Sequence, residues 1–373
     1  MLHGSIEYRP RATHDHAGSW GRPPGGHNPG MHDHPTPLRA DQRPTLDDVR
    51  DAAARIAGIA HVTPVLRSRS LDALAGCELF FKAENLQRGG AFKFRGATNA
   101  VFSLTKAQAA RGVVTQSSGN HGAAIALACQ LRGIPCTVVV PHAAPRIKRE
   151  AIARHGARIV DCEVAQSARN AATARVLADT GGELVHPYND GRVIAGQGTA
   201  TLELLHQVER RGSARDDARP VLDMVIAPLS GGGLMSGTCI AAKGLHAGIE
   251  TLAAEPEGAC DGHDSLASGT LIHGRVADTV SDGLRAELGP LTFDILRGLC
   301  DGVLLVDDIE TIAAMRLVWE RLKLIIEPSC AVPLAAVLKH RERFAGQRVG
   351  ILLSGGNVDL DALPGLLAMA PRA

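Results

Sequence analysis

The stretch GGAFKFRGA, residues 89–97, places a lysine between two phenylalanines and between glycines. Burying an ammonium group costs free energy unless the group is paired or neutralised. Burial lowers the pKa of a lysine, and the neutral amine is a nucleophile that can form a Schiff base with a carbonyl compound. Lys93 is therefore a candidate catalytic amine. The alternative is a helix whose apolar face flanks a lysine that extends its charged end to solvent.

Two glycine-containing motifs follow short apolar runs. SSGNHG, residues 117–122, comes directly after GVVTQ, and its small residues leave backbone N–H groups accessible at a helix start, which is an anion site. It is also consistent with a simple capped helix. SGGGLMSG, residues 230–237, follows DMVIAP, and its consecutive glycines let the backbone wrap closely around a phosphate. It lacks both the GxGxxG spacing of dinucleotide sites and the Lys-Ser/Thr pair of a P-loop. We infer the phosphate of another small cofactor.

Two more motifs place side chains with hydroxyl or carboxylate oxygens directly after apolar runs. SGGN, residues 354–357, places the neutral hydroxyl of Ser354 after VGILL, although it also fits a simple tight turn. AAEPEGACD, residues 253–261, brings Glu255, Glu257 and Asp261 close together. Carboxylates suit Mg²⁺ or Ca²⁺, although surface loops often carry three of them with no metal. A lysine in an apolar setting, a phosphate cradle and no nucleotide motif together point to pyridoxal phosphate, whose aldehyde needs a lysine amine.

The elements that position these motifs alternate between short apolar strands and helical patterns of ten or more residues. Such alternation predicts an α/β fold with a parallel sheet covered on both faces. Ligands of open parallel sheets bind outside the carboxyl ends of the strands, where the motifs lie. A capping pattern of Thr45 and Asp48 predicts the first helix, through Ile59. The predicted strands span 78–84, 112–116, 136–140, 157–162, 223–228, 251–255, 302–306 and 349–354.

Composition narrows the class of protein. The 373 residues suffice for one large domain or two lobes, and a net charge of +1 gives no electrostatic case for nucleic acid or a membrane surface. The 8 cysteines include no CxxC pair, which is typical of a reducing compartment. With no apolar run long enough to span a bilayer and no signal core, we expect a cytoplasmic protein. Residues 1–43, rich in Pro, Gly and His, are predicted to be a disordered tail, and 210–220 a solvated loop.

Six motifs, in chain order, resemble the serine/threonine dehydratase and serine racemase family, and the resemblance runs from about Thr45 to Leu360. The resemblance implies PLP fold type II, the tryptophan-synthase-β-like α/β fold, with two lobes that each hold a mostly parallel sheet flanked by helices. The small lobe would span 112–189, and the large lobe 44–111 and 190–373. It also implies a homodimer acting on a small amino acid. The motifs are KAENLQRGGAFKFRGA, SSGNHG, IAGQGT, SGGGL, VWERLKLIIEPS and LSGGNVDL.

The resemblance also implies roles for individual residues. Lys93 would form the Schiff base and take the Cα proton, and Ser118 matches the residue that faces this lysine in racemases. Asn120 would contact the ring hydroxyl of the cofactor and Ser354 its pyridine nitrogen. The cofactor phosphate would be held by Ser230, Gly231, Gly232, Gly233 and Leu234, and the substrate by Ser117, Ser118, Asn120, His121 and Arg169.

Three features of the family pattern bear on the metal and the substrate. Glu255, Ala259 and Asp261 match the spacing with which racemases hold a structural Mg²⁺, Ca²⁺ or Mn²⁺. Ser230 stands where the family often has glycine. Ala286 stands where serine racemases tend to have a hydroxyl.

The expected activity is an ammonia-lyase (dehydratase) reaction that converts L-serine or L-threonine to the 2-oxo acid and ammonia. One alternative is a serine racemase that uses Lys93 and Ser118 and has side elimination activity. Another is a 3-hydroxyaspartate ammonia-lyase, in which Arg285 or Arg169 pairs with the second carboxylate, unless these arginines face solvent. A β-replacement enzyme usually differs from SSGNHG in its substrate loop. An intact Lys93 argues against a protein that only binds the cofactor.

Overall fold

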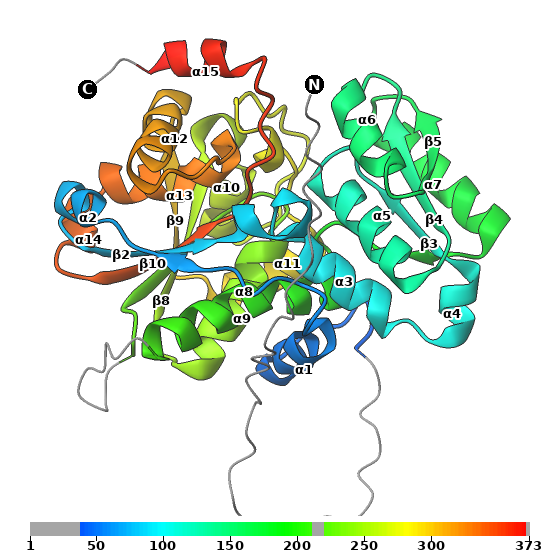
Figure 1. Ribbon diagram of the computed structural model, residues 1–373, viewed down its shortest axis with the longest axis horizontal. Coiled ribbons are helices and arrows are strands. Elements are labelled where there is room, and N and C mark those ends of the chain that lie inside the picture. The colour runs from blue at the N-terminus through cyan, green and yellow to red at the C-terminus, as the bar shows by residue number, and fades with distance from the viewer. Residues whose placement is uncertain (1–37, 211–219, 371–373) are drawn as a thin grey trace, which may run out of the picture. The chain divides into compact units, whose positions relative to one another are not determined.

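The computed structural model describes residues 38–210 and 220–370 (Figure 1). The predictions for residues 1–37 and 211–219 lie outside these ranges. Residues 38–43, which the sequence placed in the tail, are described, and the Ala40 carbonyl accepts a hydrogen bond of 2.8 Å from Gly191 N. Among the described residues, no helix is long and apolar enough to cross a membrane.

The larger of two sheets has six strands in the order β1-β2-β10-β7-β8-β9. All neighbours are parallel except β1 and β2. The smaller sheet has four parallel strands in the order β5-β4-β3-β6. The strands are β1 (Val65–Leu66), β2 (Glu78–Ala83), β3 (Val113–Gln116), β4 (Cys136–Pro141), β5 (Arg158–Cys162), β6 (Glu183–Leu184), β7 (Met224–Pro228), β8 (Glu250–Pro256), β9 (Gly302–Val306) and β10 (Arg348–Leu353).

All eight predicted strands are present within a residue or so of their predicted ends, and the α/β class is confirmed. Strands β1 and β6 were not predicted, because two residues are too short to show a pattern. Each sheet maps to a separate part of the chain, since β3 to β6 are consecutive. The lobe boundaries at 112 and 189 remain a prediction.

Helices cover both faces of each sheet (Figure 1). On β7, Met224 and Ile226 pack into the core beneath α12 and α13, whereas Val225 and Ala227 pack into the core beneath α8 and α9. Because successive side chains of such a strand face two different apolar cores, nearly every residue along the strand is apolar. The covering helices are α5 (Asn120–Arg132), α6 (Arg146–Ala153), α7 (Gln166–Thr180), α8 (Gly191–Arg210), α9 (Gly233–Leu245), α11 (Pro290–Leu299), α12 (Asp308–Leu322) and α13 (Pro328–Lys339).

The first described helix, α1 (Leu46–Ile56), begins with the predicted capping box, in which Thr45 and Asp48 satisfy each other's backbone N–H groups. It ends three residues before the predicted Ile59. The other helices are α2 (Arg69–Ala75), α3 (Lys93–Ser103), α4 (Lys106–Arg111), α10 (Asp261–Ser268), α14 (Arg341–Phe344), α15 (Leu363–Met369) and the 3₁₀ turn η4 (Asp282–Leu284).

Candidate active site

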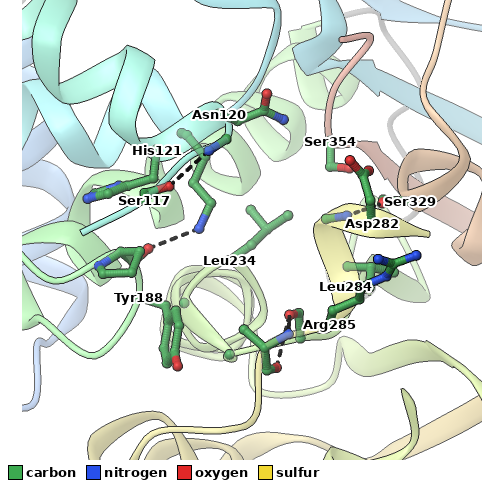
Figure 2. Close-up of a pocket in the computed structure, with 18 of the residues that line it drawn as sticks. Ser117, Asn120, His121, Tyr188, Leu234, Asp282, Leu284, Arg285, Ser329 and Ser354 are labelled. Atoms are coloured by element: carbon green, nitrogen blue, oxygen red, sulfur yellow. Dashed lines mark hydrogen bonds between the residues drawn. The ribbon is translucent and has the colours of Figure 1, made fainter. Parts of the chain in front are cut away.

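A cavity of about 460 Å³ lies at the carboxyl ends of β3, β7 and β10 and at the starts of α3, α5 and α9. Figure 2 shows Ser117 and His121 on one side of this cavity, with Asp282 and Ser354 on the other. The structure thus brings together every residue that the sequence assigned to cofactor or substrate. These residues are Lys93, Ser117, Ser118, Asn120, His121, Arg169, Ser230, Gly231, Gly232, Gly233, Leu234 and Ser354.

Lys93 is the first residue of α3, and its amine faces the cavity. Its Nζ donates a hydrogen bond of 2.9 Å to the Pro187 carbonyl and lies 5.1 Å from the centre of the Phe92 ring. Burial lowers the pKa of Lys93 from 10.5 to about 8. The apolar flanks noted in the sequence therefore make this amine easier to deprotonate, which a Schiff-base lysine requires.

The start of α3 is fixed by Arg95, which is fully buried. Its guanidinium donates to both carboxylate oxygens of Glu84, at 2.7 and 2.8 Å, and to both oxygens of Glu203, each at 2.8 Å. Charge-assisted bidentate contacts of this kind fix orientation as well as distance. Because Lys93 is two residues before Arg95, this network also sets where the amine lies.

The residues Ser230 to Leu234, which we call the glycine loop, precede and begin α9. They lie so close to their neighbours that side chains do not fit at Gly231 and Gly232. A Cβ atom at Gly231 would lie 2.4 Å from the Tyr188 ring, and one at Gly232 would lie 2.7 Å from Thr292 Cβ. Gly232 also has a φ of 88°, a conformation that favours glycine. The loop opens a helix of 13 residues, whose first N–H groups attract anions. A phosphate group fits this cradle.

The SSGNHG segment opens α5 with neutral polar groups. Asn120 Nδ2 donates to the Glu327 carboxylate at 3.2 Å, and Asn120 Oδ1 accepts from Asn357 Nδ2 at 2.9 Å. Burial lowers the pKa of His121 well below 6.5 and that of His186 to about 4. Both imidazoles are therefore neutral at pH 7 and add no charge beside Lys93.

Several cavity residues were not identified from the sequence. Glu327, just before α13, is buried, and burial raises its pKa to about 7. The sequence feature that could have identified Glu327 is its position inside the motif VWERLKLIIEPS. Lys148 of α6 and Asp282 of η4 form an ion pair of 2.6 Å, and no sequence pattern linked them. Tyr188 packs against Gly231, and no sequence pattern predicted it as a cavity residue.

The predicted metal residues do not line the cavity, and they lie between the carboxyl end of β8, which contains Glu255, and the start of α10 at Asp261. Glu255 is buried, and its carboxylate accepts hydrogen bonds from Gly262 N and His263 N at 3.1 and 2.8 Å. Asp261 is also buried and accepts from Leu288 N at 3.0 Å. Burial raises the pKa of Glu255 to about 8 and that of Asp261 to about 6. In the described ranges, no three His, Cys, Asp or Glu side chains gather as a metal site.

Parallel sheets with a lysine amine and a glycine-lined anion cradle at their carboxyl ends define a PLP fold type II enzyme. The sequence matches the family described as "Pyridoxal-phosphate dependent enzyme" over residues 56–355. The chain belongs to this family, and within it to the serine/threonine dehydratase and serine racemase group. The family resemblance expected from the motifs is thereby confirmed.

Individual relatives cover nearly the whole described chain. A β-hydroxyaspartate dehydratase of Paracoccus denitrificans is 47% identical over 86% of this chain and 98% of its own length. A serine racemase of Arabidopsis thaliana is 47% identical over 84% of this chain and 93% of its own. The solved structure of maize serine racemase is 44% identical with a TM-score of 0.81, covering 87% of this chain and 97% of that one. These similarities show a racemase or ammonia-lyase without deciding between them.

Proposed function

We propose that this chain is an ammonia-lyase that dehydrates β-hydroxy amino acids and prefers 3-hydroxyaspartate to L-serine and L-threonine. The observation that carries the preference is that two arginines line the cavity, Arg169 being half-buried and Arg285 more exposed to solvent. The dehydratase relative from Paracoccus supports the same choice. If the SSGNHG segment holds the α-carboxylate, a second carboxylate can meet an arginine.

Both arginines keep donors for such a carboxylate. Arg285 Nε and Nη2 donate to the Thr279 carbonyl at 3.2 and 2.5 Å, and Arg169 Nε donates to the Val164 carbonyl at 3.0 Å. A guanidinium has five N–H donors in a planar fork, so each still has N–H groups for a bidentate contact. The existing contacts hold the guanidinium groups in place, which lowers the entropic cost of binding a substrate.

Pyridoxal phosphate, when bound, supplies the electron withdrawal that acidifies Cα. The loop from Ser230 to Leu234 would hold its phosphate, and Asn120 and Ser354 its ring. Lys93 takes the proton from Cα, and hydroxide leaves Cβ and is protonated to water. The resulting enamine tautomerises and hydrolyses, so water is lost and regained and the net reaction releases ammonia and the 2-oxo acid.

The test compares kcat/KM for 3-hydroxyaspartate, L-serine and L-threonine in the wild type and in Arg285→Ala and Arg169→Ala. A lost charged hydrogen bond corresponds to about 10- to 100-fold, and we expect this loss for the dicarboxylate alone in at least one variant. Arg175→Ala, on the same helix as Arg169 but outside the cavity, is the matched control. If the wild type does not turn over 3-hydroxyaspartate, or if both variants weaken all substrates equally, simple serine/threonine dehydration stands.

A serine racemase is the second candidate, because Ser118 lines the same cavity as Lys93. A racemase needs two groups that exchange a proton with Cα from opposite faces. Ser118→Ala should then reduce racemisation and attack on D-serine by about 100-fold or more, with elimination of L-serine little changed. Equal losses in all three reactions would mean that Ser118 only binds the carboxylate.

We further propose that a divalent cation such as Mg²⁺ binds Glu255, Asp261 and the Ala259 carbonyl and stabilises the fold. The carboxylates of Glu255 and Asp261 are buried and close enough for Asp261 to help raise the pKa of Glu255, and hard oxygen donors of this kind suit such an ion. Adding Mg²⁺ to chelator-treated protein should raise the melting temperature, since only the folded state binds the ion. Glu255→Gln should remove the shift, and Glu257→Gln, whose exposed carboxylate pairs with Lys339, should keep it. Wild-type protein without a shift refutes the site.

A further inference from the structure

The glycine loop is joined to the opposite wall of the cavity by one hydroxyl. Ser230 Oγ donates a hydrogen bond of 3.0 Å to the Ala286 carbonyl and accepts one of 3.1 Å from Ala286 N. A single side chain thus satisfies both backbone groups of one residue. Ala286 has no polar side chain of its own, so this attachment depends on Ser230.

Ala286 belongs to a segment that we call the strap, residues 282–288, which consists of η4 and the four residues after it and lies before α11. Figure 2 shows Asp282, Leu284 and Arg285 of the strap along the cavity wall. The backbone of the strap is held near its two ends, and the Glu287 carboxylate also accepts hydrogen bonds from Gly274 N and Arg275 N at 2.6 and 3.0 Å. Ser329 Oγ accepts a hydrogen bond of 2.9 Å from Gly283 N, and Asp261 accepts one of 3.0 Å from Leu288 N.

Between these ends, Ser230 is the attachment next to Arg285. The guanidinium of Arg285 turns back to the Thr279 carbonyl, so this contact is made by the side chain. The Ser230 contact holds the backbone of the strap through the adjacent residue. The same residue begins the glycine loop, so the position of the strap is tied to the position of the loop.

We propose that Ser230 is a positioning residue that holds the strap against the glycine loop and thereby places Arg285 for the second carboxylate of the substrate. Ser230 acts through Ala286 and does not need to touch the substrate. The choice of a dicarboxylate rests on the proposed function, but the attachment of the strap does not.

Hydrogen exchange measured by mass spectrometry on the holoenzyme tests the attachment directly. In Ser230→Ala, exchange in peptides covering 284–288 should be about fivefold faster, as expected for a lost hydrogen bond of about 1 kcal/mol. Ser236→Ala is the matched control, because Ser236 is a buried serine of α9 whose hydroxyl has no hydrogen-bond partner among the described residues. Ser329→Ala releases the Gly283 N–H instead and should accelerate exchange in peptides that include residue 283. If Ser230→Ala leaves this exchange unchanged, the proposal is wrong.

Kinetics then separate positioning from cofactor binding. In Ser230→Ala, kcat/KM for 3-hydroxyaspartate should fall about fivefold relative to kcat/KM for L-serine, because the loss falls on the second carboxylate. A Kd for pyridoxal phosphate weakened tenfold, with equal losses for every substrate, would show that the hydroxyl binds phosphate instead. If the wild type accepts only monocarboxylates, the proposed substrate fails, and the strap attachment is judged by the exchange experiment alone.

Discussion

Lys93 and Arg95 lie two residues apart at the start of α3, and their surroundings differ in the partners they provide. Arg95 is fully buried between Glu84 and Glu203, which raise its pKa above the ordinary value. Lys93 has the neutral Pro187 carbonyl as its hydrogen-bond acceptor, and burial alone lowers its pKa. The difference shows that carboxylate partners counteract the effect of burial and hold a cation in a structural network, whereas a buried cation without them stays chemically available.

A second lysine supports this conclusion. Lys82, on β2, is fully buried like Arg95, and its Nζ donates to Glu203, the Thr63 carbonyl and Gln207 at 2.7, 2.7 and 2.9 Å. Burial lowers its pKa, and Glu203 and Glu84 oppose that shift. Lys82 and Arg95 therefore share one carboxylate, in a network whose role is to hold β2, α3 and α8 together.

The largest expected effect comes from removing the available amine. Lys93→Ala should lower kcat/KM for elimination by more than about 10³-fold, because the variant loses both the Schiff base and the base that takes the Cα proton. Steady-state kinetics and the visible absorbance of the bound cofactor measure these losses. Substantial turnover by a folded Lys93→Ala protein would contradict the assignment.

Breaking the network should damage stability instead of chemistry. Glu84→Gln removes a charge that Arg95 and Thr63 contact in a fully buried site, and removing one partner of a buried ion pair typically costs about 3–5 kcal/mol. Urea unfolding of the holoenzyme measures the loss. Arg50→Ala, which breaks an exposed pair with Asp47, should leave the unfolding midpoint unchanged. A Glu84→Gln protein as stable as wild type would mean that the network is unimportant for folding.

The smallest effect concerns the stability of the apoprotein as a function of pH. The pKa of Lys93 is about 8 in the folded state and 10.5 ordinarily, so the unfolded chain binds more protons between these values. The lysine therefore destabilises the fold fully below pH 8, and this cost disappears as the pH rises to 10.5. Lys93→Met should stabilise the apoprotein on the order of 1–3 kcal/mol at neutral pH.

The control for this prediction is the paired lysine. Lys82→Met should destabilise the apoprotein at neutral pH, because Glu203 loses a partner. Urea unfolding near pH 7 and pH 10 measures both variants, and the gain from Lys93→Met should shrink at the higher pH. Two lysine variants that change stability in the same direction would remove the distinction drawn between the paired and the available cation.

Local patterns in the sequence determined eight of the ten strands among the described residues and the α/β class, and the family resemblance identified most of the cavity residues. Strand propensity and alternation with helices act over short stretches, so β9 was predicted with its observed ends, Gly302 and Val306. The motifs after β7 and β10 could be assigned to one site, because parallel strands of one sheet place their carboxyl ends along the same edge, whereas the motif after β3 reaches this site only through the packing of the two sheets. Lys93 stood out because its phenylalanine neighbours are adjacent in the chain.

Only the tertiary structure decided which distant charges meet. Glu203 lies 108 residues from Arg95, and Lys148 lies 134 residues from Asp282, so no local pattern marks either pair. No local pattern marks the contact between Ser230 and Ala286 either. The Ser230 hydroxyl binds the backbone N–H and carbonyl of Ala286, which do not distinguish this residue from others. Local sequence fixes which side chains are available, whereas the packing of the sheets fixes their partners, and those partners decide each group's charge and role.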